Sequence, residues 1–318
     1  MESIWQERLQ MRIDNGENPD EVFGPWAVDF NYAWWQTNMT NDDHLRHKVA
    51  LALSEILVVS IFSDLRDNAY TVTDYYDMLL RNSFGNYRDL LRDVTLHISM
   101  GYYLSHLNNP KANPEANQRP DENYAREIMQ LFSIGLNELN IDGSEKLQNG
   151  QVIPTYDNDD IREFAKVFTG LGPGAINMYV DWTDEPYFGL GLWGADPTVP
   201  MKMYENFHEP GQKNLLNGYV IPAGQTGMQD IDDAIDHLFN HDNVGPFLAR
   251  RLIQRLVKSN PSPQYIQRVA EAFNGKNGNP RGDMKSVIRA ILLDEEARGD
   301  DYVMQEDASR LREPMLRY

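Results

Sequence analysis

Apolar residues recur at helical spacing through most of the first two-thirds of the chain. The clearest stripe lies in residues 42–62, where one helix face would carry Leu45, Val49, Ala52, Leu53, Ile56 and Leu57. Similar spacing predicts helices over about 70–82, 87–106 and 120–138, separated by polar or glycine-containing joints. The pattern therefore predicts a mainly helical, all-α fold.

One short stretch breaks this pattern. Apolar residues on both sides of Asn149-Gly150 predict one small β-hairpin near residues 139–156, because this dipeptide suits a two-residue hairpin turn. A helix capped by Asp157 or Asn158 is expected next. The later part of the chain predicts helices over about 159–169, 229–240, 244–258, 262–274 and 283–295.

Residues 171–228 show little periodicity and contain many glycines. Structureless segments of this length are uncommon inside compact domains. Aromatic residues in the segment argue against disorder: Tyr179, Trp182, Tyr187, Phe188, Trp193, Tyr204 and Phe207. We therefore expect an ordered flap in a single helical domain, or between two lobes at 1–170 and 229–318, and we expect the chain to be a fragment of a longer protein.

Composition narrows the classes of function. The chain has 29 Lys and Arg against 48 Asp and Glu, a net charge of −19, which disfavours nucleic acid and favours cations or neutral ligands. The absence of cysteine excludes disulfides, thiolate metal sites and cysteine nucleophiles. There is no run of 18 apolar residues and no signal peptide in the first fifteen, so the sequence predicts no membrane span.

The segment 119–132 is a dense polar cluster on an otherwise apolar predicted helix. Asn123 and Glu127 fall on one face, and Glu122 lies four residues before Arg126, a spacing that allows an ion pair. On a buried helix, Glu127 is expected to be mostly buried and paired with a basic or amide group. Two interpretations stay open: a structural network at a helix start, or a site in which Glu127 or Glu122 is a ligand or general base.

A second polar cluster, His208, Glu209 and Lys213, lies near the end of the flap. Histidine titrates near neutral pH, so His208 either closes a turn or acts as a general acid beside Glu127 or Glu122. In the second hypothesis the flap folds over the helix start and brings His208 into one pocket with Glu122, Asn123 or Glu127. Substrate would then be bound by Asn123, Arg126, Lys213, Trp182 and Trp193.

Other patterns give weaker signals. The pairs His44 and His47, and His237 and His241, have metal-compatible spacing, and residues 157–160 offer oxygen ligands. None completes a known metal motif, and no dinucleotide-binding or phosphate-binding glycine motif is present. The sequence therefore assigns no metal site and leaves the cofactor unknown.

Several segments resemble the uncharacterised bacterial family named domain of unknown function 1800. They are residues 45–54, 75–91, 119–136, 156–170, 207–213 and 281–294. The resemblance implies a mostly helical bacterial protein, often exported to the periplasm or beyond, and often encoded beside a sulfatase-like protein. It implies no established reaction, cofactor or catalytic residue. Many relatives have a histidine-rich stretch where this chain has residues 52–57, so a site built on those histidines would be absent here.

Two functional hypotheses follow. The first is an exported hydrolase or lyase that acts on a carbohydrate-like polymer by Glu and His acid–base chemistry. The second is a non-catalytic binding or assembly module that works with a partner protein, such as the sulfatase-like neighbour. A pocket shared by Glu127 and His208 would favour the enzyme. Separate and individually satisfied side chains would favour the module.

Overall fold

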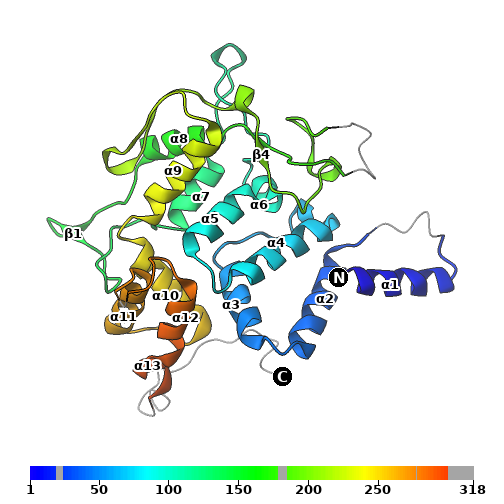
Figure 1. Ribbon diagram of the computed structural model, residues 1–318, viewed down its shortest axis with the longest axis horizontal. Coiled ribbons are helices and arrows are strands. Elements are labelled where there is room, and N and C mark those ends of the chain that lie inside the picture. The colour runs from blue at the N-terminus through cyan, green and yellow to red at the C-terminus, as the bar shows by residue number, and fades with distance from the viewer. Residues whose placement is uncertain (19–23, 178–184, 277, 300–318) are drawn as a thin grey trace.

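The computed structural model describes residues 1–18, 24–177, 185–276 and 278–299. These residues form 13 α-helices and only small antiparallel two-stranded sheets, which confirms the mainly helical fold (Figure 1). The helices are α1 (Glu2–Asp14), α2 (Ala27–Thr40), α3 (His44–Ser54), α4 (Ala69–Asn82), α5 (Tyr87–Leu96), α6 (Ile98–Tyr103), α7 (Asn123–Gln130), α8 (Asn158–Val167), α9 (Gly227–Phe239), α10 (Val244–Leu256), α11 (Pro263–Phe273), α12 (Met284–Leu293) and α13 (Glu295–Arg298). In the described part of the chain, no helix is long and apolar enough to cross a membrane.

Three of the predicted helices are shorter than their apolar patterns. The helix predicted over 42–62 ends at Ser54, and its cap is Asp43, whose side chain accepts from the backbone N–H of Arg46. His97 divides the helix predicted over 87–106, because its Nδ1 accepts the backbone N–H of Ser99 and so caps α6. The helix predicted over 120–138 is reduced to α7.

The β-hairpin is confirmed at its predicted turn. Strands β1 (Leu147–Gln148) and β2 (Gln151–Val152) pair across Asn149 and Gly150, whose φ angles of 53° and 79° are those of the expected turn class. Two sheets inside the flap were not predicted. They pair β3 (Leu171–Gly172) with β4 (Lys202–Met203), and β5 (Lys213–Asn214) with β6 (Val220–Ile221). Two-residue strands are too short to leave an alternating pattern in sequence.

The described part of the flap also contains three 3₁₀ helices, η4 (Leu192–Gly194), η5 (Glu205–Phe207) and η6 (Leu216–Gly218). Three of its described aromatic rings pack together: Phe188 stacks on Phe207 at 3.9 Å between ring centroids and meets Tyr204 edge-on. Tyr179 and Trp182 lie outside the described residues. The described part of the flap is therefore ordered, as predicted.

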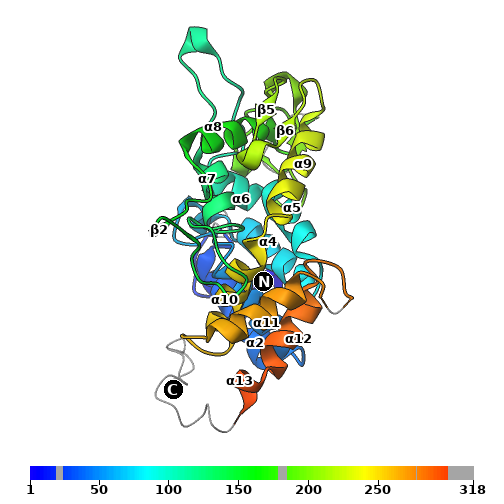
Figure 2. The same cartoon turned by 90° about the vertical axis from the view of Figure 1, so that its left-hand side faces the viewer.

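One continuous cluster of buried apolar side chains joins the early and late helices. Helix α9 packs along α5, and α10 packs against α3 (Figures 1 and 2). Backbone hydrogen bonds also close the chain on itself: the N–H of Tyr87 donates to Gly282, and the N–H of Met284 donates to Gly85, both at 2.9 Å. Residues 1–170 and 229–299 thus share a core in the described structure.

A buried amide fixes the stretch that follows α7. The side chain of Asn243 is fully buried at the start of α10. It donates to the carbonyls of Ile134 and Asn137 at 2.8 Å and accepts from the N–H of Leu139 at 2.9 Å. A single side chain therefore supplies hydrogen-bond partners to three backbone groups in the irregular segment that follows α7.

We expect Asn243→Ala to lower the free energy of unfolding by roughly 2–4 kcal/mol, because it leaves buried backbone groups without partners. Urea denaturation measures this loss. The matched control is Asn240→Ala, at an exposed position on the preceding turn, for which we expect a loss under about 1 kcal/mol. Equal losses in the two variants would show that Asn243 is not a structural tie.

Candidate functional site

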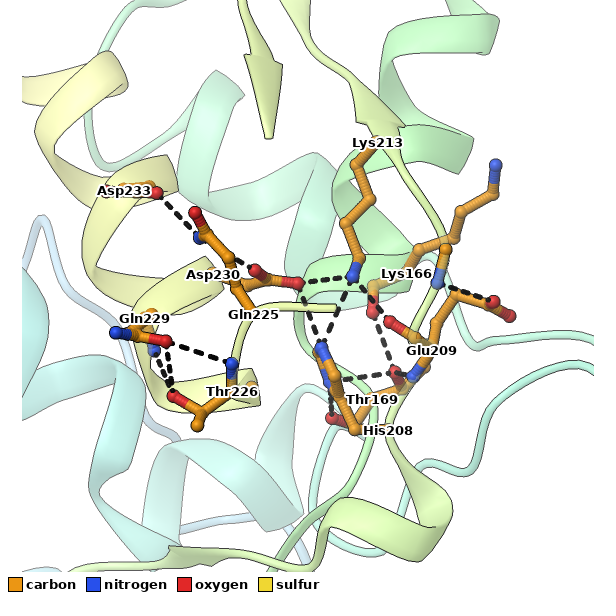
Figure 3. A network of polar contacts seen from close by, with 12 residues as sticks. Lys166, Thr169, His208, Glu209, Lys213, Gln225, Thr226, Gln229, Asp230 and Asp233 are labelled. Carbon is orange, nitrogen blue, oxygen red and sulfur yellow. Dashed lines mark hydrogen bonds and ion pairs between the residues drawn. The ribbon is translucent and has the colours of Figure 1, made fainter. Parts of the chain in front are cut away.

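The flap cluster identified in the sequence lies inside the protein. His208 and Lys213 meet Asp230 of α9, and the three residues are 2%, 1% and 1% exposed (Figure 3). The Nε2 of His208 lies 3.0 Å from Oδ2 of Asp230, and the Nζ of Lys213 donates to the same oxygen. We call these three residues the buried ion cluster.

Further hydrogen bonds complete the buried ion cluster. The Nδ1 of His208 lies 2.9 Å from the carbonyl oxygen of Thr169. Lys213 also donates to the carbonyl of Glu209, and Gln225 donates to the second oxygen of Asp230 at 3.1 Å. Both ring nitrogens of His208 therefore face protein atoms, and the ring has almost no contact with solvent.

The hydrogen bonds keep Asp230 ionised. Burial alone would raise the pKa of this carboxyl, but the hydrogen bonds from His208 and Lys213, with the positive charge of Lys213, outweigh burial and lower it. The resulting carboxylate is the counterion that Lys213 needs at 1% exposure. The cluster is therefore suited to holding structure, and it is closed to an external substrate.

The buried ion cluster joins three segments that are distant in sequence. It links the residues after α8, the end of the flap and the first turn of α9 (Figure 3). Gly170 allows the close approach: its φ is +85°, and a Cβ there would lie 2.9 Å from the backbone nitrogen of His208. A glycine is required at this position because the flap backbone lies directly against it.

The polar start of α7 is a separate feature. Glu122 and Arg126 form the predicted ion pair, with 3.6 Å between Oε2 and Nη2. Asn123 is exposed as the first helical residue. Glu127 is only half-buried, and its Oε2 is a buried atom with no hydrogen-bond partner. The expectation of a mostly buried, paired Glu127 was therefore wrong.

Glu127 is the one acidic residue within α7. Burial raises the pKa of its carboxyl, and the opposing charge of Arg126 does not cancel that effect. Tyr156 lies close enough for the charge of Glu127 to act on its phenol, whose pKa is also raised, mainly by burial. A half-buried acid of this kind is a candidate for binding a donor group.

Gly170, which lies against the backbone of His208, is tied to the segment before α7. The N–H of Gly170 donates to the carbonyl of Asn109, whose side chain binds the backbone of Asp121 just before α7. The hydrogen-bonding and ion-pair partners of His208 are Thr169, Lys213 and Asp230. Its predicted partners Glu122, Asn123 and Glu127 are not among them.

The remaining predicted residues are dispersed. Trp193 is 53% exposed in η4, and Trp182 lies outside the described residues. Asp157 caps α8 through the N–H groups of Asp159 and Asp160, as predicted. Within the described ranges, no group of three or more His, Asp or Glu side chains is placed to hold a metal ion.

An exposed apolar feature on α2 was missed in the sequence. Val28, Tyr32, Trp35 and Met39 are 37%, 56%, 40% and 75% exposed, and their spacing of four, three and four residues places them on one helix face. We call them the α2 stripe. The only charged residue of α2, Asp29, is buried and paired with Arg8. With α1, helix α2 lies at one side of the molecule (Figure 1).

Comparison with known proteins gives one match. The model of a family described as a protein of unknown function, DUF1800, matches residues 19–318. No curated protein and no solved structure matches the chain.

We expect Asp230→Asn to lower the free energy of unfolding by roughly 3–5 kcal/mol, because Lys213 would remain buried without a counterion. The exposed control on the same helix is Asp236→Asn, which disturbs a partly exposed pair with Arg88 and should cost less than about 1 kcal/mol. Adding Lys213→Met to Asp230→Asn should recover part of the loss. A loss for Asp230→Asn as small as that of the control would contradict the structural role.

The same carboxyl predicts a pH dependence. Since its folded-state pKa is below the ordinary value of 3.8, its contribution is fully present above that value and is lost as pH falls towards the folded-state pKa. The stability gap between the natural chain and Asp230→Asn should therefore be constant from about pH 5 to pH 7 and shrink below about pH 4. Chemical denaturation across this range measures it, and a gap that widens in acid would contradict the assignment.

Glu127→Gln should leave the free energy of unfolding at pH 7 unchanged within about 0.5 kcal/mol, or increase it. The reason is that a neutral amide removes the cost of ionising a carboxyl whose pKa is raised. Thermal denaturation at pH 7 tests this, with Glu122→Gln as a control that loses the half-exposed pair with Arg126. A loss of several kcal/mol for Glu127→Gln would mean that the carboxylate is a required structural partner.

Proposed function

This chain belongs to the DUF1800 family, and we propose that it acts as a non-catalytic binding module that docks a partner protein on the α2 stripe. The observation that carries the proposal is the stripe itself: four apolar side chains on one helix face, each more than a third exposed. Contiguous exposed apolar surface of this kind is typical of protein interaction sites. The proposal is the assembly hypothesis made specific to one face.

The charge of the chain supports one class of partner. The chain has a net charge of −19, whereas α2 exposes no charged side chain. A partner with an apolar helix face and basic residues at its rim would bury apolar surface at the centre, and the negative net charge of the chain would attract it. A second copy of the chain would meet like charge, so the proposal commits to a basic-rimmed partner.

The buried ion cluster favours this proposal over the hydrolase or lyase hypothesis. A general acid must reach the substrate atom that receives its proton, and His208 is 2% exposed with both ring nitrogens facing protein groups. Lys213 is equally enclosed. An exported setting and a sulfatase-like partner, which the family resemblance implies, are compatible with a docking role and form part of the proposal.

The test uses the full chain and a helical peptide of Leu and Lys that presents an apolar face with a basic rim. We expect this peptide to bind at least roughly tenfold more tightly than a Leu and Glu peptide with the same apolar face. The triple variant Tyr32→Ser, Trp35→Ser, Met39→Ser should weaken the binding of the Lys peptide by roughly tenfold or more. Fluorescence anisotropy of the labelled peptide measures both.

The matched control removes equivalent side chains elsewhere: Tyr187→Ser, Trp193→Ser, Leu147→Ser, all from exposed positions. It should bind the Lys peptide as the natural chain does. Sedimentation should also show a monomer at moderate salt. Unchanged binding in the α2 triple variant would mean that binding follows charge alone, equal weakening by the two triple variants would mean that it follows exposed apolar surface in general, and a dimer that the α2 variant dissociates would assign the face to a second copy. Any of these results would overturn the proposal.

A further inference from the structure

The opposite face of α2 encloses a small aromatic pocket. It lies between α2, α3 and α4 and has a volume of about 110 Å³. Three aromatic side chains line it, Phe30 and Trp34 from α2 and Tyr76 from α4. The ring of Tyr76 meets those of Phe30 and Trp34 at interplanar angles of 73° and 74°, so the ring planes are not parallel and line the space from different directions.

Polar side chains complete the lining: Thr37, Asn38, His47, Thr73 and Asp77. His47 of α3 is 6% exposed, and its Nδ1 is buried without a hydrogen-bond partner. Such a buried nitrogen calls for a hydrogen-bond partner, because an unsatisfied polar atom is costly in a dry site. In the tautomer with the proton on Nε2, the partner of Nδ1 is a donor. Asp77 of α4 also lines the pocket. The residue as a whole is exposed, while its carboxyl is partly covered by its surroundings.

Among the described residues that line the pocket, Asp77 is the only acid, and Met1, which carries the amino terminus, lines it as well. None of the described residues that line it is Lys or Arg. Burial raises the pKa of the Asp77 carboxyl and Asp74 raises it further, against the opposing charges of Arg81, the chain's amino terminus and His47. These shifts show a carboxylate that its surroundings do not fully compensate. A cationic ligand would supply the missing charge.

We propose that this pocket binds a small alkylammonium group. The aromatic rings contact the group by cation–π interaction, the Asp77 carboxylate neutralises its charge, and its N–H donates a hydrogen bond to Nδ1 of His47. Aromatic rings around a carboxylate are an arrangement that recognises methylated ammonium. The volume limits the group to a few heavy atoms. For comparison, an apolar cavity of about 150 Å³ in another protein holds one benzene molecule. The proposal does not rest on the α2 stripe, which faces the other way.

The experiment is calorimetric titration of the full chain near pH 7 with trimethylammonium chloride. We expect saturable binding that is at least roughly tenfold tighter than that of tert-butanol, a neutral molecule of the same shape. Tetramethylammonium lacks an N–H and should bind several-fold more weakly than trimethylammonium, because it cannot donate to His47. A blocked dimethyllysine, whose ammonium keeps one N–H, distinguishes the two sources of the ligand: it binds as tightly as trimethylammonium if the ligand is a side chain of a partner, and it is excluded if the ligand is a free amine.

Variants separate the pocket from the docking face. Asp77→Asn changes an exposed group and should weaken trimethylammonium binding by roughly tenfold while the circular dichroism spectrum is unchanged. Trp34→Leu should do the same, whereas its neighbour Trp35→Leu, on the outer face, should leave ammonium binding unchanged and weaken the Lys peptide. Absence of binding by the folded natural chain, equal binding of tert-butanol, or unchanged affinity in Asp77→Asn would overturn the proposal.

Discussion

The enclosed pair of Lys213 and Asp230 is the constraint on which the middle of the structure depends. Two charges at 1% exposure are tolerated only with close mutual contact and further hydrogen bonds, and these come from His208, Glu209 and Gln225. The flap must therefore return to α9 at one position, with Gly170 beneath it. The long irregular segment is ordered at its end because its charges have no other compensation.

The same constraint places the most reactive side-chain types inside the protein and leaves other residues at its surface. The side chains that look most reactive in the sequence, His208 and Lys213, hold segments together inside the protein. The two surfaces that we propose for binding are apolar or aromatic and lie on α2, one face exposed and the other lining a pocket. One helix with only a single charged residue, itself buried, would thus serve two different contacts in a strongly acidic protein.

Local interactions were predictable from the sequence, and distant ones were not. The Asp157 cap and the Asn149-Gly150 turn involve neighbours within a few residues, so their residue types are sufficient signals. His208 meets Thr169 and Asp230 across 39 and 22 residues, and sequence spacing says nothing of that meeting. The only sequence signal that Asp230 is buried was its position beside Ile231, on the apolar side of α9. The apolar pattern of α2 likewise cannot say which face lacks a covering element.

The closure between Gly85–Tyr87 and Gly282–Met284 has a consequence for how the protein is made. The contact joins residues 195 apart in the sequence. At synthesis rates of about 5–20 residues per second, the later segment is therefore synthesised on the order of 10–40 s after the earlier one. During that interval the apolar faces of α3 and α5 have no α9 or α10 to cover them. Native folding of the shared core is thus a late event, and the nascent chain is a natural client for chaperones that shield apolar helices.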